Sequence, residues 1–435
     1  MSDVAVTSYP TQRVAAASRA TYAAFIGAGF AFASWASRIP QVRNRLHLTP
    51  ADLGLVLLSL AVGAVIALPI SGLILHRLNT RVTVTIMALV VTGALGVIAV
   101  GYRFGVIPVA IGLFFFGFAN GAWDVAMNVQ GADVERHLGK AIMPRYHAGF
   151  SLGTVFGALI GAAMIALGVP VTAHLLGAAA VIAAVVPLMV RHFLPDPDHA
   201  DSHEESGGSR PSVLARWREP RTLLVGVFVL AFAFSEGTGN DWISVALIDG
   251  YHAEAVVGTL GFAVFLTAMT VARWVGPPLL DRHGRVVVVR GLALVALVGL
   301  ILFVFSPNVP LAFVGALLWG TGTSLGFPVG MSAAADDSKA AAGRVSVVAS
   351  IGYFAFLGGP PLIGFLGSRV GVLHALTAVA VMLAIATMVA TALRPLPGSV
   401  PGSVPGSLPS SPPAVPLPSG SGAVPVEIDP SSTGR

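Results

Sequence analysis

Apolar stretches long enough to cross a membrane alternate with short polar loops along most of the chain. A stretch of about 18–24 residues, at a helical rise of about 1.5 Å per residue, matches the roughly 30 Å hydrocarbon core of a bilayer. A polar segment after the sixth stretch separates two sets of six. The pattern therefore predicts twelve transmembrane helices, at residues 21–37, 53–75, 82–102, 104–129, 148–167, 171–190, 222–243, 255–280, 286–305, 311–334, 345–366 and 371–393.

The pattern also predicts the domain organisation of an all-α integral membrane protein with two pseudo-symmetric six-helix bundles. We expect a cytoplasmic N-terminus at 1–19, a first bundle at 20–190, a cytoplasmic linker at 191–220, a second bundle at 221–394 and a tail at 395–435. The linker is rich in Asp, His, Glu, Ser and Gly. The tail repeats Pro-Gly-Ser units and has no apolar face to bury, so we expect it to be disordered.

Composition strengthens the membrane interpretation and excludes several other classes. Hydrophobic residues make up 55% of the chain and charged residues 10%, with a mean hydropathy of +0.82, whereas soluble domains carry about 25% charged residues. The net charge of +5 is spread over short loops without a basic stripe, which argues against nucleic-acid binding. The chain has no cysteine, and its histidines do not pair with acids at metal-binding spacing, so we expect no metal and no cofactor.

The distribution of Lys and Arg predicts the orientation in the membrane. These residues concentrate in the loops that share a side with both predicted termini, and positive loops favour the cytoplasm. The loop after the first span, with Arg38, Arg43 and Arg45, is an exception. We expect a multi-pass protein of the cell (inner or plasma) membrane with both termini in the cytoplasm.

Two similar basic loops, about 205 residues apart, each follow the second apolar stretch of their half. The clearer copy reads Asp281-Arg282-His283-Gly284-Arg285, and the other reads His76-Arg77-Leu78-Asn79-Thr80-Arg81 after Gly72. A loop repeated at the same place indicates a duplicated bundle, which is typical of solute transporters.

Six spans, a long linker and six more spans, with a basic loop between the second and third span of each half, resemble the major facilitator superfamily. The run from Trp123 through Asp124, Asn128 and His147 to Ser151 resembles a bacterial branch related to fucose-type sugar permeases. In that family such loops stabilise the outward-open state, a role that the resemblance assigns to Asp281, Arg282, Gly284 and Arg285, and in the first copy to Gly72, Arg77 and Arg81.

The first copy departs from the family pattern at two positions. His76 stands where an acid is expected and Asn79 where a glycine is expected. Asn tolerates positive φ better than most residues, so the turn itself is expected to survive. The first loop therefore has no acid of its own that could make the contact expected of the family. An equal alternative is that Arg77 and Arg81 only set the orientation of the protein in the membrane.

Four ionisable residues fall inside predicted spans, namely Asp124, Glu236, Asp241 and Arg273. A charge in the bilayer costs from about 3 to more than 10 kcal/mol, so such residues are functional candidates. Asn120, Asp124 and Asn128 are four residues apart and share one helix face. Asp124 is a candidate proton carrier, with a helix-to-helix hydrogen bond as the alternative role.

In the second half, Glu236 and Asn240 lie one turn apart on the seventh span and are candidates for the solute or proton site. Asp241 is interpreted as a solvated residue near the span end. Arg273 is placed at a depth similar to that of Asp124, which suggests a pair that changes between states. An Arg273 that extends to the cytoplasm is an equal alternative.

His147 and Ser151 share a face near the start of the fifth span, where His147 is either a proton relay or an interfacial residue. Trp123 and Trp319 are candidates for stacking on a sugar ring. Gly149-Phe150-Ser151-Leu152-Gly153 matches a hydrolase nucleophile motif but lacks the preceding strand. Its glycines continue every four residues to Gly161, which predicts close helix packing rather than catalysis.

These observations predict a secondary transporter that moves a small solute, a sugar-like or other small polar molecule, by alternating access. The sequence has no phosphate-binding loop for ATP, so proton coupling is the preferred energy source. The expected partners are the solute, protons and the lipid bilayer, and we expect a monomer without enzymatic activity. Two alternatives stay open: export of a hydrophobic compound by proton antiport, and a sensor or scaffold that does not transport.

Overall fold

The computed structural model describes residues 9–139, 142–196, 213–337 and 340–396, which belong to one compact unit. The middle of the expected linker, 197–212, lies outside the described residues. The expected tail also lies outside them from residue 397 onward. The predictions for these segments therefore stay predictions.

The described part of the first half contains six helices in chain order. They are α1 (Thr11–Ala36), α2 (Ile39–Arg45), α3 (Pro50–Gly101), α4 (Val106–Leu138), α5 (Met143–Ala166) and α6 (Val171–Val190). The second half contains α7 (Val213–Arg216), α8 (Pro220–Tyr251), α9 (Ala255–His283), α10 (Arg285–Phe305), α11 (Val309–Thr323), α12 (Gly326–Ala334), α13 (Ala341–Val370), α14 (Val372–Ala375), α15 (Thr377–Val389) and the 3-10 helix η2 (Ala390–Leu393). The expected all-α membrane fold is confirmed.

Ten segments of the described chain are helical, long and apolar enough to cross a membrane. One of them, α3, contains two predicted spans, because its backbone leaves helical geometry only at Asn79. The first predicted span lies in α1, which is rich in alanine, serine and threonine and is the least apolar of the predicted spans. Together these segments account for the twelve predicted spans.

The helix boundaries differ from the predictions where hydropathy is a poor guide. The predicted tenth span is divided into α11 and α12 around Ser324 and Leu325, and the predicted last span is divided into α14 and α15 at Leu376. The loop after the first span contains the additional short helix α2, which begins with Ile39 and Pro40. Hydropathy marks the apolar length of a segment but not a local break in its hydrogen bonding.

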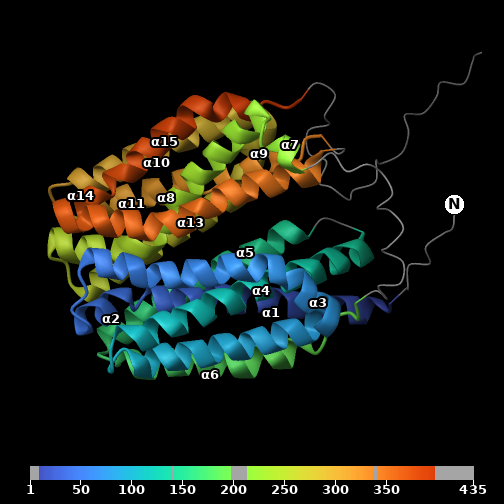
Figure 1. Ribbon diagram of the computed structural model, residues 1–435, viewed down its shortest axis with the longest axis horizontal. Helices are drawn as coiled ribbons and strands as arrows, with labels where there is room; N and C mark the ends of the chain where they lie inside the picture. Colours follow the sequence, from blue (N-terminus) through green and yellow to red (C-terminus); the bar gives the residue numbers. More distant parts are fainter. Residues whose placement is uncertain (1–8, 140–141, 197–212, 338–339, 397–435) are drawn as a thin grey trace, which may run out of the picture. The chain divides into compact units, whose positions relative to one another are not determined.

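Helices of the same half pack mainly on one another, and α3 contacts α13 while α5 contacts α9 across the two halves. Figure 1 shows the two groups, with α1 to α6 on one side and α8 to α15 on the other. Within the first half, a Cβ on Gly153 would lie 2.1 Å from the carbonyl oxygen of Ile26. Close approach of α5 to α1 therefore requires glycine there, as the four-residue glycine spacing predicted.

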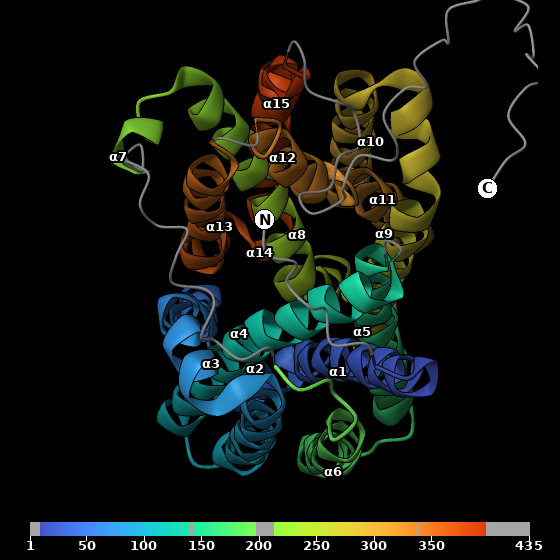
Figure 2. The same ribbon diagram turned by 90° about the vertical axis from the view of Figure 1, so that its right-hand side faces the viewer.

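The two ends of the helices differ in how the halves meet. We call the end with α2 the α2 end, and the opposite end, where residues 191–196 and 213–219 lie, the linker end. At the α2 end, Arg43 is 2.6 Å from Asp249, and Ala51 N donates to Ser368 Oγ over 3.0 Å. Figure 2 views the linker end, where the ribbons of the two halves form separate groups.

Two arginines of the segment around α2 have specific partners, which explains the exception to the charge distribution. Arg38 is only 2% exposed and donates to His174 Nδ1 over 2.8 Å and to the carbonyl of Val169 over 3.1 Å. Arg43 bridges to Asp249 of the other half. Arg38 and Arg43 therefore bond to other helices and loops, so they do not count as free positive charges of a solvent-exposed loop.

Candidate functional site

An ion pair lies inside the second half, between α8 and α9. One terminal nitrogen of Arg273 is 3.0 and 2.9 Å from the two carboxylate oxygens of Glu236, and both side chains are about a quarter exposed (26% and 21%). The Nε of Arg273 donates to the carbonyl of Ser324 over 3.0 Å. That carbonyl lies in the break between α11 and α12, where helical hydrogen bonding is interrupted.

The pair corrects two predictions for Arg273. In this structure Arg273 does not contact Asp124, and it turns to α8 instead of extending to the linker end. The depth of Arg273 along its own span accounts neither for the length of an arginine side chain nor for the offset between the ends of neighbouring helices. The Arg273 side chain therefore reaches Glu236 on the neighbouring helix α8.

Asp124 lies on the side of α4 that faces the other half. It is exposed, and it sits about 140–180° around the helix from the exposed apolar side chains Ile111, Phe115 and Val129. Tyr353 of α13, in the other half, is close enough to interact electrostatically with the Asp124 carboxylate. The exposed side of Asp124 thus belongs to the space between the halves.

The predicted polar face of α4 is only partly formed. Asn128 Nδ2 donates to the backbone carbonyl of Asp124 over 2.8 Å and lies 3.3 Å from its Oδ1. Asn120 is half-buried, and no partner is found for its Oδ1 among the described residues. Asp124 therefore has an amide partner but no cationic partner within the described chain.

His147 and Ser151 of α5 have different surroundings. His147 is exposed, packs edge-on against Phe25 at 5.1 Å and interacts electrostatically with Arg273 of the other half. Ser151 is 3% exposed and donates to the carbonyl of His147 over 3.3 Å. His147 therefore belongs with the central polar groups, whereas Ser151 is a packing residue.

The two tryptophans expected to stack on a sugar are core residues in this structure. Trp123 is fully buried near Gly27, and no partner for its Nε1 is found in the described chain. Trp319 is also fully buried, and its Nε1 donates to Ser235 Oγ over 2.8 Å. Hydropathy placed both rings deep in the membrane but could not tell a packed helix face from a solute-facing one.

The face of α8 beyond Glu236 carries two further polar residues. Asn240 is half-buried, one turn from Glu236, and its Oδ1 has no partner among the described residues. Asp241 was interpreted as a solvated end residue, but α8 continues to Tyr251 and Trp242 to Leu247 are all buried. Asp241 is half-buried in the interior, and the unexpected length of α8 is the reason it was missed.

The first basic loop retains its turn without glycine. Asn79 has φ 58° and ψ 168°, close to the φ 78° and ψ 157° of Gly284 in the second copy. The expectation that Asn preserves this turn is thus met. Gly72 is an exposed position within α3, and Arg77 and Arg81 are exposed at the linker end.

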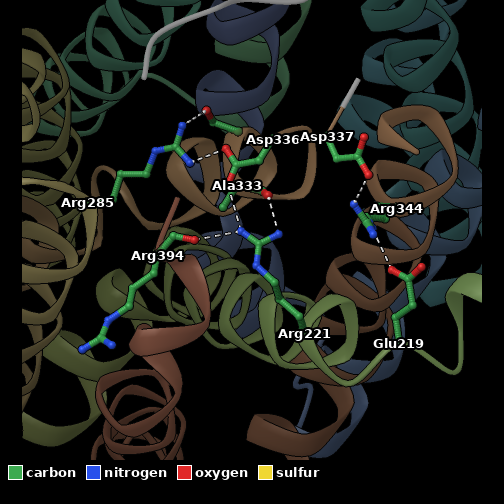
Figure 3. Close-up of polar contacts among 9 residues, drawn as sticks. Glu219, Arg221, Arg285, Ala333, Asp336, Asp337, Arg344 and Arg394 are labelled. Atoms are coloured by element: carbon green, nitrogen blue, oxygen red, sulfur yellow. Dashed lines mark hydrogen bonds and ion pairs between the residues drawn. The ribbon is translucent and has the colours of Figure 1, made fainter. Parts of the chain in front are cut away.

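The second basic loop uses a different acid from the one expected. Arg285 Nη1 is 2.6 Å from Asp336, which also pairs with Arg221 at 2.8 Å (Figure 3). Asp281 and Arg282 are exposed, and no hydrogen bond or ion pair of either is found within the described residues. The gating role that the family resemblance assigns to Asp281 and Arg282 therefore stays a prediction.

Comparison with known proteins gives the family. Residues 20–355 match the family model described as Major Facilitator Superfamily. The chain belongs to the major facilitator superfamily. It is 32% identical to the uncharacterized transporter y4wD of Sinorhizobium fredii over 371 residues, which cover 83% of this chain and 96% of that protein. The family expected from the paired loops is confirmed, and the chain is a multi-pass membrane transporter.

Two solved transporter structures share the fold of this superfamily member. A variant of the nucleoside transporter NupG has a TM-score of 0.70 at 14% identity, with 86% of this chain and 98% of that chain covered. The Escherichia coli fucose:proton symporter FucP has a TM-score of 0.58 at 16% identity, with 86% and 97% covered. At these identities the likeness shows the fold alone.

A second ionic cluster of the transporter lies at the linker end, beside the pairs that Asp336 forms with Arg221 and Arg285. Arg344 is 2.7 Å from Glu219 and 3.0 Å from Asp337 (Figure 3). Glu219 also accepts from Thr222 and Arg216. The hydrogen bond from Arg344 lowers the pKa of Glu219 to about 2. Glu219 is therefore ionised at neutral pH, and this cluster connects the start of α8 to the start of α13.

Proposed function

We propose that this chain is a proton-coupled secondary transporter that moves a small polar solute by alternating access between its halves. The carrying observation is the polar centre between the halves, with Asp124 and His147 on one side and the Glu236–Arg273 pair on the other. Charged groups inside a membrane protein are costly and typically mark solute or ion pathways.

Asp124 is the preferred proton carrier of this centre. Arg273 compensates the charge of Glu236, whereas Asp124 has only the amide of Asn128. A carboxylate in a low-dielectric interior gains most from a proton or a bound solute when no cation neutralises it. Glu236 and Arg273 then serve as a pair whose separation accompanies the change of state.

The state of this structure follows from the proposed orientation. The linker end carries most of the basic loop residues and is assigned to the cytoplasm. The Arg43–Asp249 bridge then joins the halves on the outer side, which corresponds to an inward-facing transporter. The bundles at 20–190 and 221–394 are proposed to move relative to each other about the centre.

The test is solute accumulation by the purified chain in liposomes under an imposed pH gradient. Fucose and nucleosides are the first solutes to use, because the two structurally similar transporters carry those names. Asp124→Asn is expected to abolish gradient-driven accumulation while counterflow exchange continues. Glu254→Gln is the matched control, because Glu254 is exposed and makes no side-chain capping bond. Full gradient-driven accumulation by Asp124→Asn contradicts the proposed coupling.

One observation favours the alternative of a hydrophobic substrate. An apolar cavity of about 590 Å³ lies between α9, α10 and α11, and Leu159 of the other half reaches it. Its lining residues Val271 and Val275 are exposed on the helix surface, so the cavity is accessible from the lipid side. A deletion strain that becomes sensitive to hydrophobic compounds supports export. Unchanged sensitivity together with sugar uptake supports import.

A further inference from the structure

The first basic loop is bonded to a residue from the linker. The backbone N–H of Thr80 donates to Asp196 Oδ2 over 2.8 Å, and the Thr80 hydroxyl donates to Asp196 Oδ1. Thr80 is 2% exposed, and its hydroxyl is also 3.2 Å from Gln130 Oε1 on α4. The start of the third span, the end of the fourth and the start of the linker therefore meet at one residue.

These contacts occur where the backbone needs them. At Asn79, φ 58° with ψ 168° is a conformation that only glycine adopts readily, and non-glycine residues there are strained. The helix that restarts after it has unpaired N–H groups. Asn79 Oδ1 accepts from Val82 N over 3.0 Å, and Asp196 accepts from Thr80 N. A carboxylate at a helix N-terminus is also favoured by the helix dipole.

The second copy of the loop is built differently. Gly284 adopts the turn without strain, and no side chain caps the following helix. Arg285 pairs instead with Asp336 of the α12–α13 segment. The first copy has His76 where the family pattern has an acid. Its carboxylate contact comes from Asp196, which follows α6 and begins the route to the second half.

We propose that Asp196 is a positioning residue of the transport cycle: it gives Thr80 of the first loop a carboxylate contact, as Asp336 does for the equivalent Arg285 of the second copy. Its hydrogen bonds hold the start of the linker at the corner, defined here as the contact between Thr80 of α3 and Gln130 of α4. The corner and the start of the linker then move together when the halves change state. The role rests on the proposed alternating access, but it requires no particular solute or coupling ion. A simple helix cap, without influence on the position of the corner, is the competing explanation.

The chain contains no cysteine, so introduced cysteines are the only sites for spin labels. One labelled pair, Ile86→Cys with Val287→Cys, spans the halves toward the linker end. A second pair, Phe104→Cys with Phe305→Cys, spans the α2 end, and all four side chains are exposed. Pulsed electron paramagnetic resonance measures both distance distributions in Asp196→Asn, with Glu254→Gln as the control.

Asp196→Asn is expected to broaden or shift the linker-end distribution and to lower the apparent Tm by about 2–4 °C. The double variant Asp196→Asn with Asn79→Gly separates the two explanations. Relief of the backbone strain restores stability, yet the linker stays unfastened, so the altered distribution persists. If Tm falls in Asp196→Asn while the linker-end distribution keeps its wild-type form, Asp196 is only a cap. An unchanged Tm with unchanged distances also overturns the proposal.

The Tm and the spin-label distances do not depend on proton coupling, because both are measured without solute. A negative result for Asp196 leaves the proposed proton coupling through Asp124 unaffected, and a negative result for Asp124 leaves the proposed role of Asp196 unaffected. Unaltered linker-end distances in a well-folded double variant are sufficient to reject the role of Asp196.

Discussion

Arg273 holds Glu236 through one terminal nitrogen and the carbonyl of Ser324 through its Nε. The arginine thereby connects α8 and α9 with the break between α11 and α12, which are separate segments of the chain. In a continuous helix the carbonyl of Ser324 would accept from residue 328, which is a proline and has no N–H, so this carbonyl is left without a helical donor. The Nε of Arg273 therefore supplies the donor that the helix lacks at this carbonyl.

Removal of one member of this pair is expected to be worse than removal of both. Arg273→Met leaves Glu236 without its cation, and Glu236→Met leaves Arg273 without its anion, so each should cost about 1–3 kcal/mol. The double variant should be more stable than at least one single variant. Thermal unfolding in detergent measures the three, and strictly additive losses would show that the residues act independently.

Replacement of Asn79 by glycine is expected to stabilise the protein by about 1 kcal/mol, because glycine adopts φ 58° and ψ 168° without strain. The loss of the Asn79 cap costs only a few tenths of that amount. Asn79→Ala should instead destabilise, since it keeps the strain and removes the cap. Unfolding temperatures of the two variants give the comparison, and equal temperatures would mean that the turn is unstrained.

The Arg43–Asp249 bridge is expected to bias the halves toward closure at the α2 end. The pair is partly exposed, with side chains 14% and 30% accessible, so its contribution is about 0.5–1 kcal/mol. Arg43→Ala should then increase the population open at this end about two- to fivefold. Spin labels at Phe104→Cys and Phe305→Cys measure that population. The exchange Arg43→Asp with Asp249→Arg should restore closure, and a swap that resembles Arg43→Ala would refute the pairing.

The cluster around Glu219 is expected to lose its effect in acid. The folded-state pKa of Glu219, about 2, lies below its ordinary value of 4.5 because Arg344 donates to the carboxylate. The stabilisation that the ionised Glu219 carboxylate contributes is complete above about pH 4.5 and is lost as the pH falls through about 2. The difference in Tm between the wild type and Glu219→Gln should therefore shrink between these pH values. A difference independent of pH would indicate that charge does not matter at this position.

The site could be predicted only in part, and particular residues show why. Asp124 and Glu236 were found from their cost in a membrane, which depends on composition and depth alone. In this structure Arg273 pairs with Glu236 rather than with Asp124, because depth along a helix does not specify which neighbour lies opposite. Trp123 is next to Asp124 in the chain and Ser151 is one helical turn from His147, but the packing of α4 and α5 buries Trp123 and Ser151. Asp241 was misplaced because polar residues near a predicted span end do not show where the helix stops.

By itself the sequence determined the membrane location, the two sets of six spans, the paired loops and the turn that survives at Asn79. These properties depend on short stretches of chain, because the bilayer requires apolar length and a turn requires particular backbone conformations. Only the tertiary structure decided that Arg273 pairs with Glu236, that Arg285 pairs with Asp336 and that Asp196 caps Thr80. Such partners come from segments far apart in the chain, and the packing of whole helices brings them within hydrogen-bonding distance.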